Sequence, residues 1–430
     1  MIRIARVALA AAAIGAAAGP VLAQTPAAPD PGHTAWMLSA TALVLLMTLP
    51  GLALFYAGLV RLKNVLSVMT HCVAIACLVS LLWLLGGYSL AFSGAGPLIG
   101  DLGKFALLHV GRDALKGLIP ENLFFMFQMT FAIITPALIV GAFVERIRFG
   151  AVLLFSGLWL LVVYVPVCHW VWGGGWLMGR HVMDYAGGLV VHATAGVSAL
   201  MVAWRLGPRD GFPRDLSPPH NPGMTMMGAA MLWVGWYGFN AGSALAANGD
   251  AAAALMATHL SAATAGLVWM LIEWRRFKRA SMVGLVTGVV AGLATVTPAS
   301  GYVGPLGAIG LGAAGSFVCY QAVEFVKQKL KVDDSLDVFA VHGVGGILGS
   351  LLVAVLASPI FGGIGYAPGV TMADQLLTQG LGVAATMAWA AVASLTLVFV
   401  VRRLVGLRAR DEVIDDGLDM SAHGERAWNP

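Results

Sequence analysis

The sequence predicts an all-α protein that crosses a membrane many times, and three observations support this prediction. Hydrophobic residues make up 59% of the 430-residue chain and charged residues only 11%, too few charges to cover the surface of a water-soluble protein. Apolar stretches of about 20 residues, long enough to cross a bilayer as a helix, recur along the chain. Positive charges gather in alternate connecting segments. Together these observations predict a polytopic membrane protein with eleven transmembrane helices.

The eleven predicted spans are Gly- and Ala-rich for the most part, which lets helices pack closely in lipid. They are expected to begin near Thr34, Leu66, Asn122, Phe149, Gly187, Met224, Ala251, Met282, Tyr302, Asp337 and Gln375. The last span is expected to end near Val401.

The first 23 residues have the pattern of a secretory signal peptide. Arg3 and Arg6 form the charged start, an Ala-rich apolar run covers residues 7–18, and Val-Leu-Ala at 21–23 is a small-residue cleavage site. The alternative is an additional transmembrane helix, but this run is short for a span. Cleavage would leave the mature N-terminus outside the cytoplasm.

The positive charges predict the orientation. Of the 25 Lys and Arg residues, 19 lie in segments that follow odd-numbered spans or the last span, 4 follow even-numbered spans, and 2 lie in the signal. Segments on the cytoplasmic side of a membrane carry the excess of Lys and Arg. We therefore expect the N-terminus outside and the C-terminus inside.

A short pattern recurs in the two halves of the chain. Asp184 precedes His192 by eight residues in the fifth span, and Asp334 precedes His342 by eight residues in the tenth. Because each half holds five spans, an odd number, the second copy must be inverted relative to the first. Inverted repeats usually place the substrate path between the halves, near the bilayer midplane.

Two histidines lie at matching places in this repeat. His192 and His342 sit well inside apolar spans, where an ionisable side chain is costly unless it faces the bundle interior and has a partner. Both imidazoles are expected to be mainly neutral, with one donor and one acceptor each, and to face one another across the repeat. His71 and His259 have no such match, and we interpret them as structural hydrogen-bonding groups.

Several functional classes find no support in the sequence. No Asp, Glu, Lys or Arg is predicted near the middle of any span, whereas ion-coupled carriers and ion pores need carboxylates, charges or exposed carbonyls there. The pathway is therefore predicted to pass something neutral. No metal motif, nucleophile–base pairing or paired carboxylates within a span point to an enzyme or a cofactor, and no dense basic stripe points to nucleic acid. The four cysteines lie in apolar stretches and are interpreted as small core residues.

Aromatic side chains gather near the predicted outer ends of spans three, four and six. The aromatic candidates are Phe127, Phe131, Trp172, Trp236 and Phe239, and the hydroxyl of Ser243 lies near them in the sequence. Aromatics at this depth commonly anchor a protein at the membrane interface. Aromatic faces with a hydroxyl also hold a small cation by cation–π attraction, on the order of 1–2 kcal/mol where partly desolvated. Such a cup would recruit a monovalent cation of the ammonium type.

Five sequence blocks in a fixed order carry a family resemblance: residues 50–58, 141–146, 184–192, 235–243 and 337–343. With these blocks the chain resembles the ammonium transporter family, the Amt/Mep/Rh group, over almost its full length. The resemblance implies a homotrimer with one pore per subunit, in the inner (plasma) membrane of a bacterium.

The resemblance also implies roles for individual residues. An outer recruitment site is matched by Trp172, Phe127, Phe131 and Ser243, with Asp184 shaping it from behind. A gate of stacked rings is matched by Phe131 and Phe239, and the pore by His192, His342 and Trp236.

The mechanism expected from these roles is recruitment of ammonium, loss of its proton below the outer site, and passage of ammonia past the histidines. Potassium has a similar size and charge but no proton to lose, so it would meet the full desolvation barrier. Whether the proton follows by a separate path is not decided by the residues, although the family suggests electrogenic transport in bacterial members. Two alternatives stay open: a neutral ammonia or gas channel, and an ammonium sensor that signals through its tail.

After Arg403 the composition turns polar, and an exposed segment of this kind is often disordered. Here it resembles the family's cytoplasmic regulatory tail, which folds onto the subunit and helps a PII-type signal protein to block the exit. A sensor normally carries a long fused signalling domain, whereas a short segment follows the last span here. The expected organisation is a signal peptide at 1–23, an eleven-helix domain at 24–403 (first repeat about 34–207, second about 223–357, last helix about 375–403) and a tail at 404–430.

Overall fold

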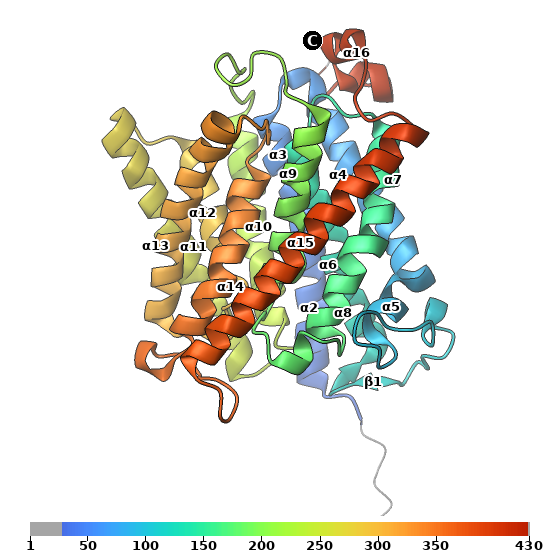
Figure 1. Ribbon diagram of the computed structural model, residues 1–430, viewed down its shortest axis with the longest axis vertical. Helices are drawn as coiled ribbons and strands as arrows, with labels where there is room; N and C mark the ends of the chain where they lie inside the picture. Colours follow the sequence, from blue (N-terminus) through green and yellow to red (C-terminus); the bar gives the residue numbers. More distant parts are fainter. Residues whose placement is uncertain (1–27, 429–430) are drawn as a thin grey trace, which may run out of the picture.

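The computed structural model describes residues 28–428, and the predicted signal peptide lies outside this range. Within it, long helices run roughly parallel to one axis and form a single bundle, with a small two-stranded sheet at one end (Figure 1). Short π- or 3₁₀-helical segments, labelled η, interrupt or connect the α-helices. The fold is all-helical apart from this sheet, as predicted.

The elements of the first half, in chain order, are α2 (Pro31–Leu46), η1 (Met47–Leu52), α3 (Ala53–Leu59), η2 (Leu62–Asn64), α4 (Val65–Leu82), η3 (Trp83–Gly87), α5 (Tyr88–Phe92), η4 (Phe105–Leu107), β1 (Leu115–Lys116), β2 (Ile119–Pro120), α6 (Glu121–Phe143), α7 (Phe149–Trp159), η5 (Leu160–Tyr164), α8 (Val165–Trp172), η6 (Met178–Arg180), η7 (Gly188–Ala193) and α9 (Thr194–Leu206). The elements of the second half are α10 (Pro222–Gly242), α11 (Gly249–Phe277), α12 (Met282–Val296), α13 (Pro305–Glu324), η8 (Phe325–Leu330), η9 (Phe339–Gly343), α14 (Val344–Leu356), η10 (Pro359–Phe361), α15 (Met372–Leu404), α16 (Asp411–Asp416) and η11 (Asp419–His423).

Nine helical stretches in the described range are long and apolar enough to cross a membrane. They are Pro31–Leu59, Leu62–Phe92, Glu121–Phe143, Phe149–Trp172, Gly188–Leu206, Gly249–Phe277, Pro305–Leu330, Phe339–Leu356 and Met372–Leu404. Helices α10 and α12 occupy the places of the sixth and eighth predicted spans, and α12 is shorter, with 15 residues. The chain is thus a multi-pass membrane protein, while the number of eleven spans stays a prediction.

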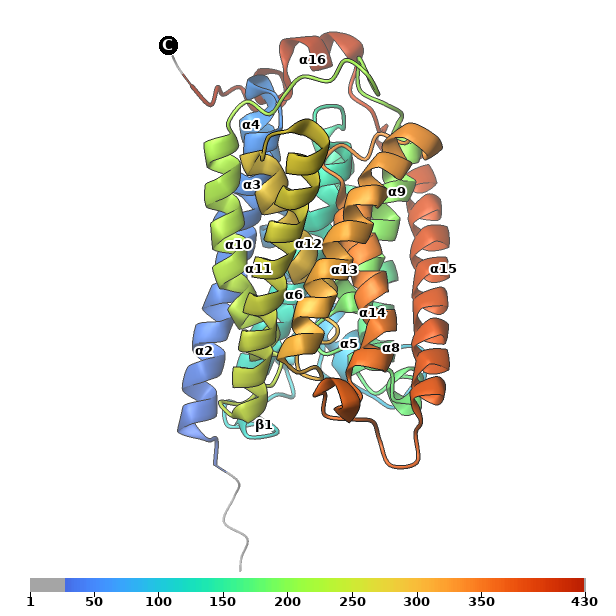
Figure 2. The same ribbon diagram turned by 90° about the vertical axis from the view of Figure 1, so that its left-hand side faces the viewer.

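The described chain begins and ends at opposite ends of the bundle (Figure 2). We call the end that carries residues 404–428 the tail end. Connecting segments that were predicted to lie on the same side of the membrane meet at this end. Arg61, after the first predicted span, pairs with Glu145, after the third. Arg148 donates to the carbonyl of Arg408 in the tail. The structure therefore brings these segments together, and which side of a membrane they face stays a prediction.

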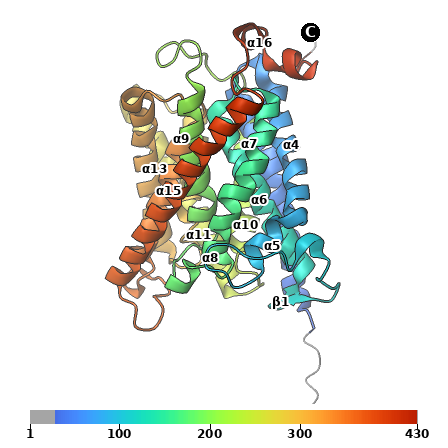
Figure 3. The same cartoon turned by 45° about the vertical axis from the view of Figure 1, so that its right-hand side comes forward.

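Helix α15 crosses the outside of the bundle diagonally and packs against α9, α14 and α7 (Figures 1 and 3). Its first turn has a capping box, in which the Thr371 hydroxyl and the Asp374 carboxylate each bind the other residue's amide. Beyond α15 the tail lies on the bundle. The Asp419 carboxylate accepts the amides of Leu66 and Ser67 at the start of α4, at 3.1 and 2.7 Å.

The two histidine-bearing segments pack reciprocally at the centre of the molecule. Helix α9 packs against η9, and α14 packs against η7. A Cβ at Gly196 would lie 2.2 Å from the Gly343 Cα, and a Cβ at Gly346 would lie 2.6 Å from the His192 Cβ. Only glycine allows this approach, so main chain meets main chain beside both histidines.

The two histidines that were interpreted as structural hydrogen-bonding groups differ. The His259 Nδ1 lies 2.7 Å from the Tyr237 hydroxyl, in agreement with that interpretation. His71 is buried, and neither of its ring nitrogens has a hydrogen-bond partner within residues 28–428. It stacks on Phe149, with ring centroids 5.8 Å apart, and faces His423 of the tail. For His71 the interpretation was wrong, because within the described residues its ring packs against the Phe149 and His423 rings without a hydrogen bond.

Candidate functional site

Four aromatic rings from three helices meet in the half of the bundle opposite the tail end. Phe127 and Phe131 lie one turn apart on α6, which is buried on nearly every side, and their ring centroids are 5.0 Å apart. Trp172, the last residue of α8, meets the Phe131 ring edge-on at 5.8 Å. Phe239 of α10 stacks on Phe131 at 4.1 Å with an interplanar angle of 24°. The predicted recruitment and gate aromatics are therefore adjacent.

Asp184 lies directly behind this aromatic cluster. Its main-chain carbonyl accepts the indole N–H of Trp172 at 2.9 Å, which fixes the orientation of that ring. Its carboxylate accepts four backbone amides at the start of η7, those of Gly187, Gly188, Leu189 and Val190, at 2.6 to 3.2 Å. Burial raises the pKa of this carboxyl, and the amides oppose the rise by binding its charged form.

Ser243 caps the last turn of α10 and is half-buried. Its hydroxyl donates to the Phe239 carbonyl at 2.9 Å. Because this bond occupies the only proton of the hydroxyl, the oxygen is left as an acceptor. That polarity suits a cationic donor such as ammonium.

The two histidines form a direct pair on the tail-end side of the Phe131–Phe239 stack. Their Nδ1 atoms are 3.3 Å apart, and the rings lie 5.3 Å apart at 20° to one another. Two neutral imidazoles can share this contact only if one donates from Nδ1 and the other accepts. One Nε2 is then a donor and the other an acceptor. The His192 Nε2 has no partner within the described residues.

Trp236 holds the His192 ring from one side. The two rings stack with centroids 5.5 Å apart, and the Trp236 indole N–H donates to the Thr297 hydroxyl at 2.9 Å. Thr297 follows α12 and is fully buried. This bond fixes the tryptophan, and through it one wall of the histidine site.

Two cavities meet at His342. The first is a narrow space of about 10 Å³, close to the least that holds one water. It is lined by both histidines, Trp236, Phe239 and apolar side chains. The second is a vestibule of about 210 Å³ towards the tail end, lined among others by His342, Tyr56, Lys327 and Asp337. The stacked phenylalanines, the narrow cavity and the vestibule thus follow one another along a single path.

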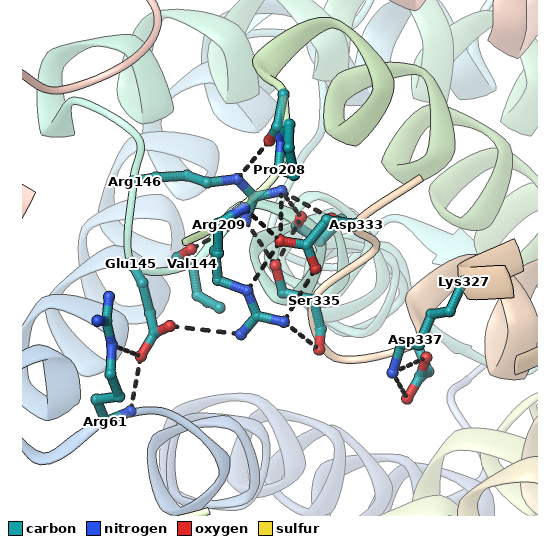
Figure 4. A network of polar contacts seen from close by, with 12 residues as sticks. Arg61, Val144, Glu145, Arg146, Pro208, Arg209, Lys327, Asp333, Ser335 and Asp337 are labelled. Atoms are coloured by element: carbon teal, nitrogen blue, oxygen red, sulfur yellow. Dashed lines mark hydrogen bonds and ion pairs between the residues drawn. The ribbon is translucent and has the colours of Figure 1, made fainter. Parts of the chain in front are cut away.

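A buried charged network at the tail end, the hub, consists of Glu145, Arg146, Arg209, Asp333 and Ser335 (Figure 4). Arg209 and Ser335 also line the vestibule. Arg209 binds Asp333 through both carboxylate oxygens at 2.9 Å and also contacts Glu145 at 3.4 Å. Arg146 is fully buried and donates to the Ser335 hydroxyl at 2.6 Å and to the Asp333 carbonyl at 2.7 Å. The hub therefore joins the segment after α6, the segment after α9 and the segment before η9.

The charges in the hub are matched. Burial alone would raise the pKa of Glu145, but the Arg209 guanidinium and the Arg61 amide hold it below its usual value. The pKa of Asp333 is likewise lowered, because its contacts with Arg209 and Arg146 outweigh its burial. Both carboxyls are therefore ionised at neutral pH.

The comparisons with known proteins agree with this architecture. The family described as Ammonium Transporter Family matches residues 35–428. The "Ammonium transporter" of Bacillus subtilis (strain 168) is 44% identical over 402 residues, which cover 92% of this chain and 98% of that protein. The chain belongs to the ammonium transporter family. A second relative, "Ammonium transporter Amt1" of Archaeoglobus fulgidus, is 45% identical over 399 residues, which cover 92% of this chain and 99% of that protein.

Two solved structures resemble most of the bundle. Candida albicans Mep2 superposes with a TM-score of 0.82 at 34% identity, covering 89% of this chain and 87% of that chain. A structure described as "Sensor Amt Protein" gives a TM-score of 0.85 at 29% identity, covering 91% of this chain and 98% of that chain. The predicted family resemblance is thereby confirmed.

In this ammonium transporter the predicted site residues are neighbours, each in contact with another member of the set or with its main chain. The sequence interpretation missed four features: Thr297, the hub, the Lys327–Asp337 ion pair at 2.7 Å, and the environment of Asp334. Glu145 and Arg146 belong to one of the blocks that carry the family resemblance. Their position in the sequence does not indicate which residues they contact in the hub. Asp334 had been singled out only as a marker of the repeat.

Proposed function

We propose that this ammonium transporter recruits ammonium at the aromatic cluster, removes its proton and conducts ammonia past the histidine pair. The observation that supports this most strongly is the order of groups along the path: π faces with a hydroxyl acceptor, then a closed phenylalanine stack, then a narrow cavity with two imidazoles. Each group suits a different state of the substrate.

Recruitment would take place at Trp172, Phe127, Phe131 and the Ser243 oxygen. The π faces attract the cation, on the order of 1–2 kcal/mol where partly desolvated. The Ser243 oxygen accepts one N–H, and the Asp184 carboxylate behind the cluster adds negative potential without contact. Such binding is weak enough to be reversed.

Conduction would follow beyond Phe131 and Phe239, where the narrow cavity offers no charge to a cation. Ammonia is neutral, donates and accepts, and so can exchange hydrogen bonds with the two Nε2 atoms. A potassium ion would lose its hydration there with nothing to replace it. We propose that the proton crosses separately, so that transport carries net charge.

We further propose eleven spans, with two inverted five-helix repeats and a final helix in α15. The reciprocal packing of α9 on η9 and α14 on η7 supports the repeat. The basic segments at the tail end support a cytoplasmic location for that end, in a bacterial inner membrane with the N-terminus outside. The mature chain would begin after a cleaved signal.

A homotrimer is the proposed assembly. His259 is exposed on the outside of α11 and bonded to Tyr237 of α10. A polar pair on the outside of membrane helices is costly against lipid. A neighbouring copy of the chain would cover it. Native mass spectrometry of the intact protein and of the His259→Leu variant tests this assembly.

The tail is proposed to regulate conduction, with a PII-type signal protein as its partner at the cytoplasmic face. Its contacts support this proposal, because Asp419 binds the start of α4 and Ala409 donates to the Arg146 carbonyl in the hub at 2.9 Å. Movement of the tail would therefore act on residues beside the vestibule.

Two other functions compete with transport of ammonium. A neutral gas channel would need no recruitment cup, so the aromatic cluster at Trp172 favours ammonium transport over this function. An ammonium sensor is supported by the likeness to the structure described as "Sensor Amt Protein". A signalling partner on the tail would favour that second function.

The deciding experiment is a current measurement on a solid-supported membrane that carries liposomes with the purified protein. We expect a saturating current after an ammonium pulse and none after a potassium pulse. Internal pH is recorded in the same liposomes. A pH change without current would favour the neutral channel, and neither signal would favour the sensor.

A further inference from the structure

The segment before η9 contains three carboxylates in five residues, and within residues 28–428 only two of them pair with a cation. Asp333 is bound by Arg209 in the hub, and Asp337 pairs with Lys327 at 2.7 Å (Figure 4). Asp334 lies between them and is fully buried. The three cations that contact this segment, Arg146, Arg209 and Lys327, bind Asp333 or Asp337.

Asp334 also lacks the hydrogen bonds that hold its counterpart in the repeat. Asp184, eight residues before His192, accepts four backbone amides. Asp334, eight residues before His342, accepts the Phe339 amide on Oδ2 at 2.7 Å with the Val338 amide close by, while its Oδ1 has no partner within residues 28–428. A carboxylate that served only to cap the helix would be expected to resemble Asp184. A bare buried oxygen instead costs free energy unless it can carry a proton.

The surroundings of Asp334 favour its neutral form. The titratable groups that act on it are the Asp337 carboxylate, the Lys327 ammonium and the Tyr56 hydroxyl. Burial, together with the charge of Asp337, raises the pKa of Asp334 to about 7. The carboxyl can therefore gain and lose a proton near neutral pH.

The residues that directly follow Asp334 border the path. Ser335, Leu336 and Asp337 line the vestibule directly after Asp334, and His342 of the following η9 lines both the vestibule and the narrow cavity. Tyr56 also lines the vestibule.

We propose that Asp334 is a proton-binding site at the tail end of the path, which takes up the proton separated from ammonium and releases it to the vestibule. In this step ammonium gives ammonia and a proton. The proton forms the O–H of the Asp334 carboxylic acid, and its release to water or ammonia in the vestibule restores the carboxylate. The inference rests on the proposed function only for the origin of the proton.

Infrared spectroscopy of the reconstituted protein tests the site itself. As pH rises through neutral, wild-type protein should lose the carbonyl band of a buried carboxylic acid, and Asp334→Asn should lack this band. Asp337→Asn removes the neighbouring charge and should move the midpoint down by about one pH unit. Asn tolerates the left-handed backbone at position 337, where φ is 60°. Asp113→Asn, at an exposed carboxylate, is the matched control and should change nothing.

A band that persists in Asp334→Asn, or a wild-type protein without a neutral-range band, would overturn the proposal. If Asp334→Asn fails to fold, the shift in Asp337→Asn still decides the question, and an unmoved midpoint counts against Asp334.

Transport is measured in the same liposomes. Asp334→Asn should lower the ammonium-driven current by about a hundredfold relative to the ammonia flux seen as internal pH change. An unchanged ratio would show that Asp334 does not carry the proton of ammonium. A wild-type protein without current would refute electrogenic transport, whereas the infrared titration would still decide whether Asp334 binds a proton.

Discussion

The Nδ1 atoms of His192 and His342 lie 3.3 Å apart, so the two imidazoles share a single proton between those atoms. The pair is therefore one unit with one donor and one acceptor Nε2. Its members come from segments 150 residues apart in the chain.

Replacing His192 by Leu should leave the buried His342 Nδ1 without its partner and lower the ammonium current about tenfold to a hundredfold. Because the pair acts as a unit, His192→Leu with His342→Leu should cost little more than either change alone. Solid-supported membrane currents for ammonium and potassium measure both effects. The exposed His109→Leu is the control. Unchanged current and selectivity in the double variant would count strongly against the proposed pore.

Replacing Trp172 by Leu should weaken recruitment and leave the maximum current nearly unchanged. Loss of a cation–π contact of about 1–2 kcal/mol raises the half-saturating ammonium concentration about 5- to 30-fold. The concentration dependence of the current measures this. Trp204→Leu, on the exposed side of α9, should have no such effect. An equal rise in both variants would indicate a general loss of packing and not a binding site.

Replacing Thr297 by Val should free the Trp236 indole N–H in a buried place and cost about 1–3 kcal/mol of stability. Thermal unfolding in detergent measures the loss, and the current should fall because Trp236 supports His192. Thr396→Val, at an exposed position of α15, is the matched change. If Thr297→Val conducts normally, the tryptophan is held by packing alone.

Replacing Glu145 by Gln should break the hub and destabilise the protein by about 3–5 kcal/mol, because Arg209 loses one of its buried partners. The unfolding temperature and the protease resistance of the tail should both fall. The exposed Arg276–Glu324 pair gives the control, since Glu324→Gln removes a charge that water already screens. Equal losses in the two variants would refute a special role for the hub.

The hub should also make stability depend on pH in the acid range. The pKa of Glu145 is lower in the folded protein than in the unfolded chain, so its contribution is present above the unfolded value. That contribution is lost as pH falls through the folded pKa, when the carboxylate is protonated. Unfolding temperatures recorded from neutral to acid pH should fall less steeply in Glu145→Gln than in wild type. Parallel curves would contradict this assignment.

The sequence predicted the membrane bundle well because its signals are local. A stretch of about 20 apolar residues must become a helix in lipid, whatever its neighbours do. The aromatic cup and the histidine pair could also be predicted, because Phe127 and Phe131 are one turn apart and the two Asp–His spacings match. The proposed inverted repeat predicted that the two histidines, far apart in the sequence, face one another.

The hub and the Trp236–Thr297 bond could not be predicted in this way. Arg209 and Asp333 are 124 residues apart in segments without periodicity, and nothing in either segment identifies the other. The difference between the backbone contacts of Asp184 and Asp334 could not be predicted for a related reason. The same residue type at the same spacing accepts four amides in one copy and fewer in the other, and only the folded backbone decides which.

The glycine contacts beside the histidines bear on which molecules can pass. Gly196 and Gly346 bring main chain against main chain, so the position of the imidazole pair is set by atoms that no rotamer change can move. Room for a substrate with one added methyl group must therefore come from the apolar side chains of the narrow cavity, such as Leu52 and Ile134. Discrimination against alkylated amines would then depend on these side chains and not on the spacing of the histidines.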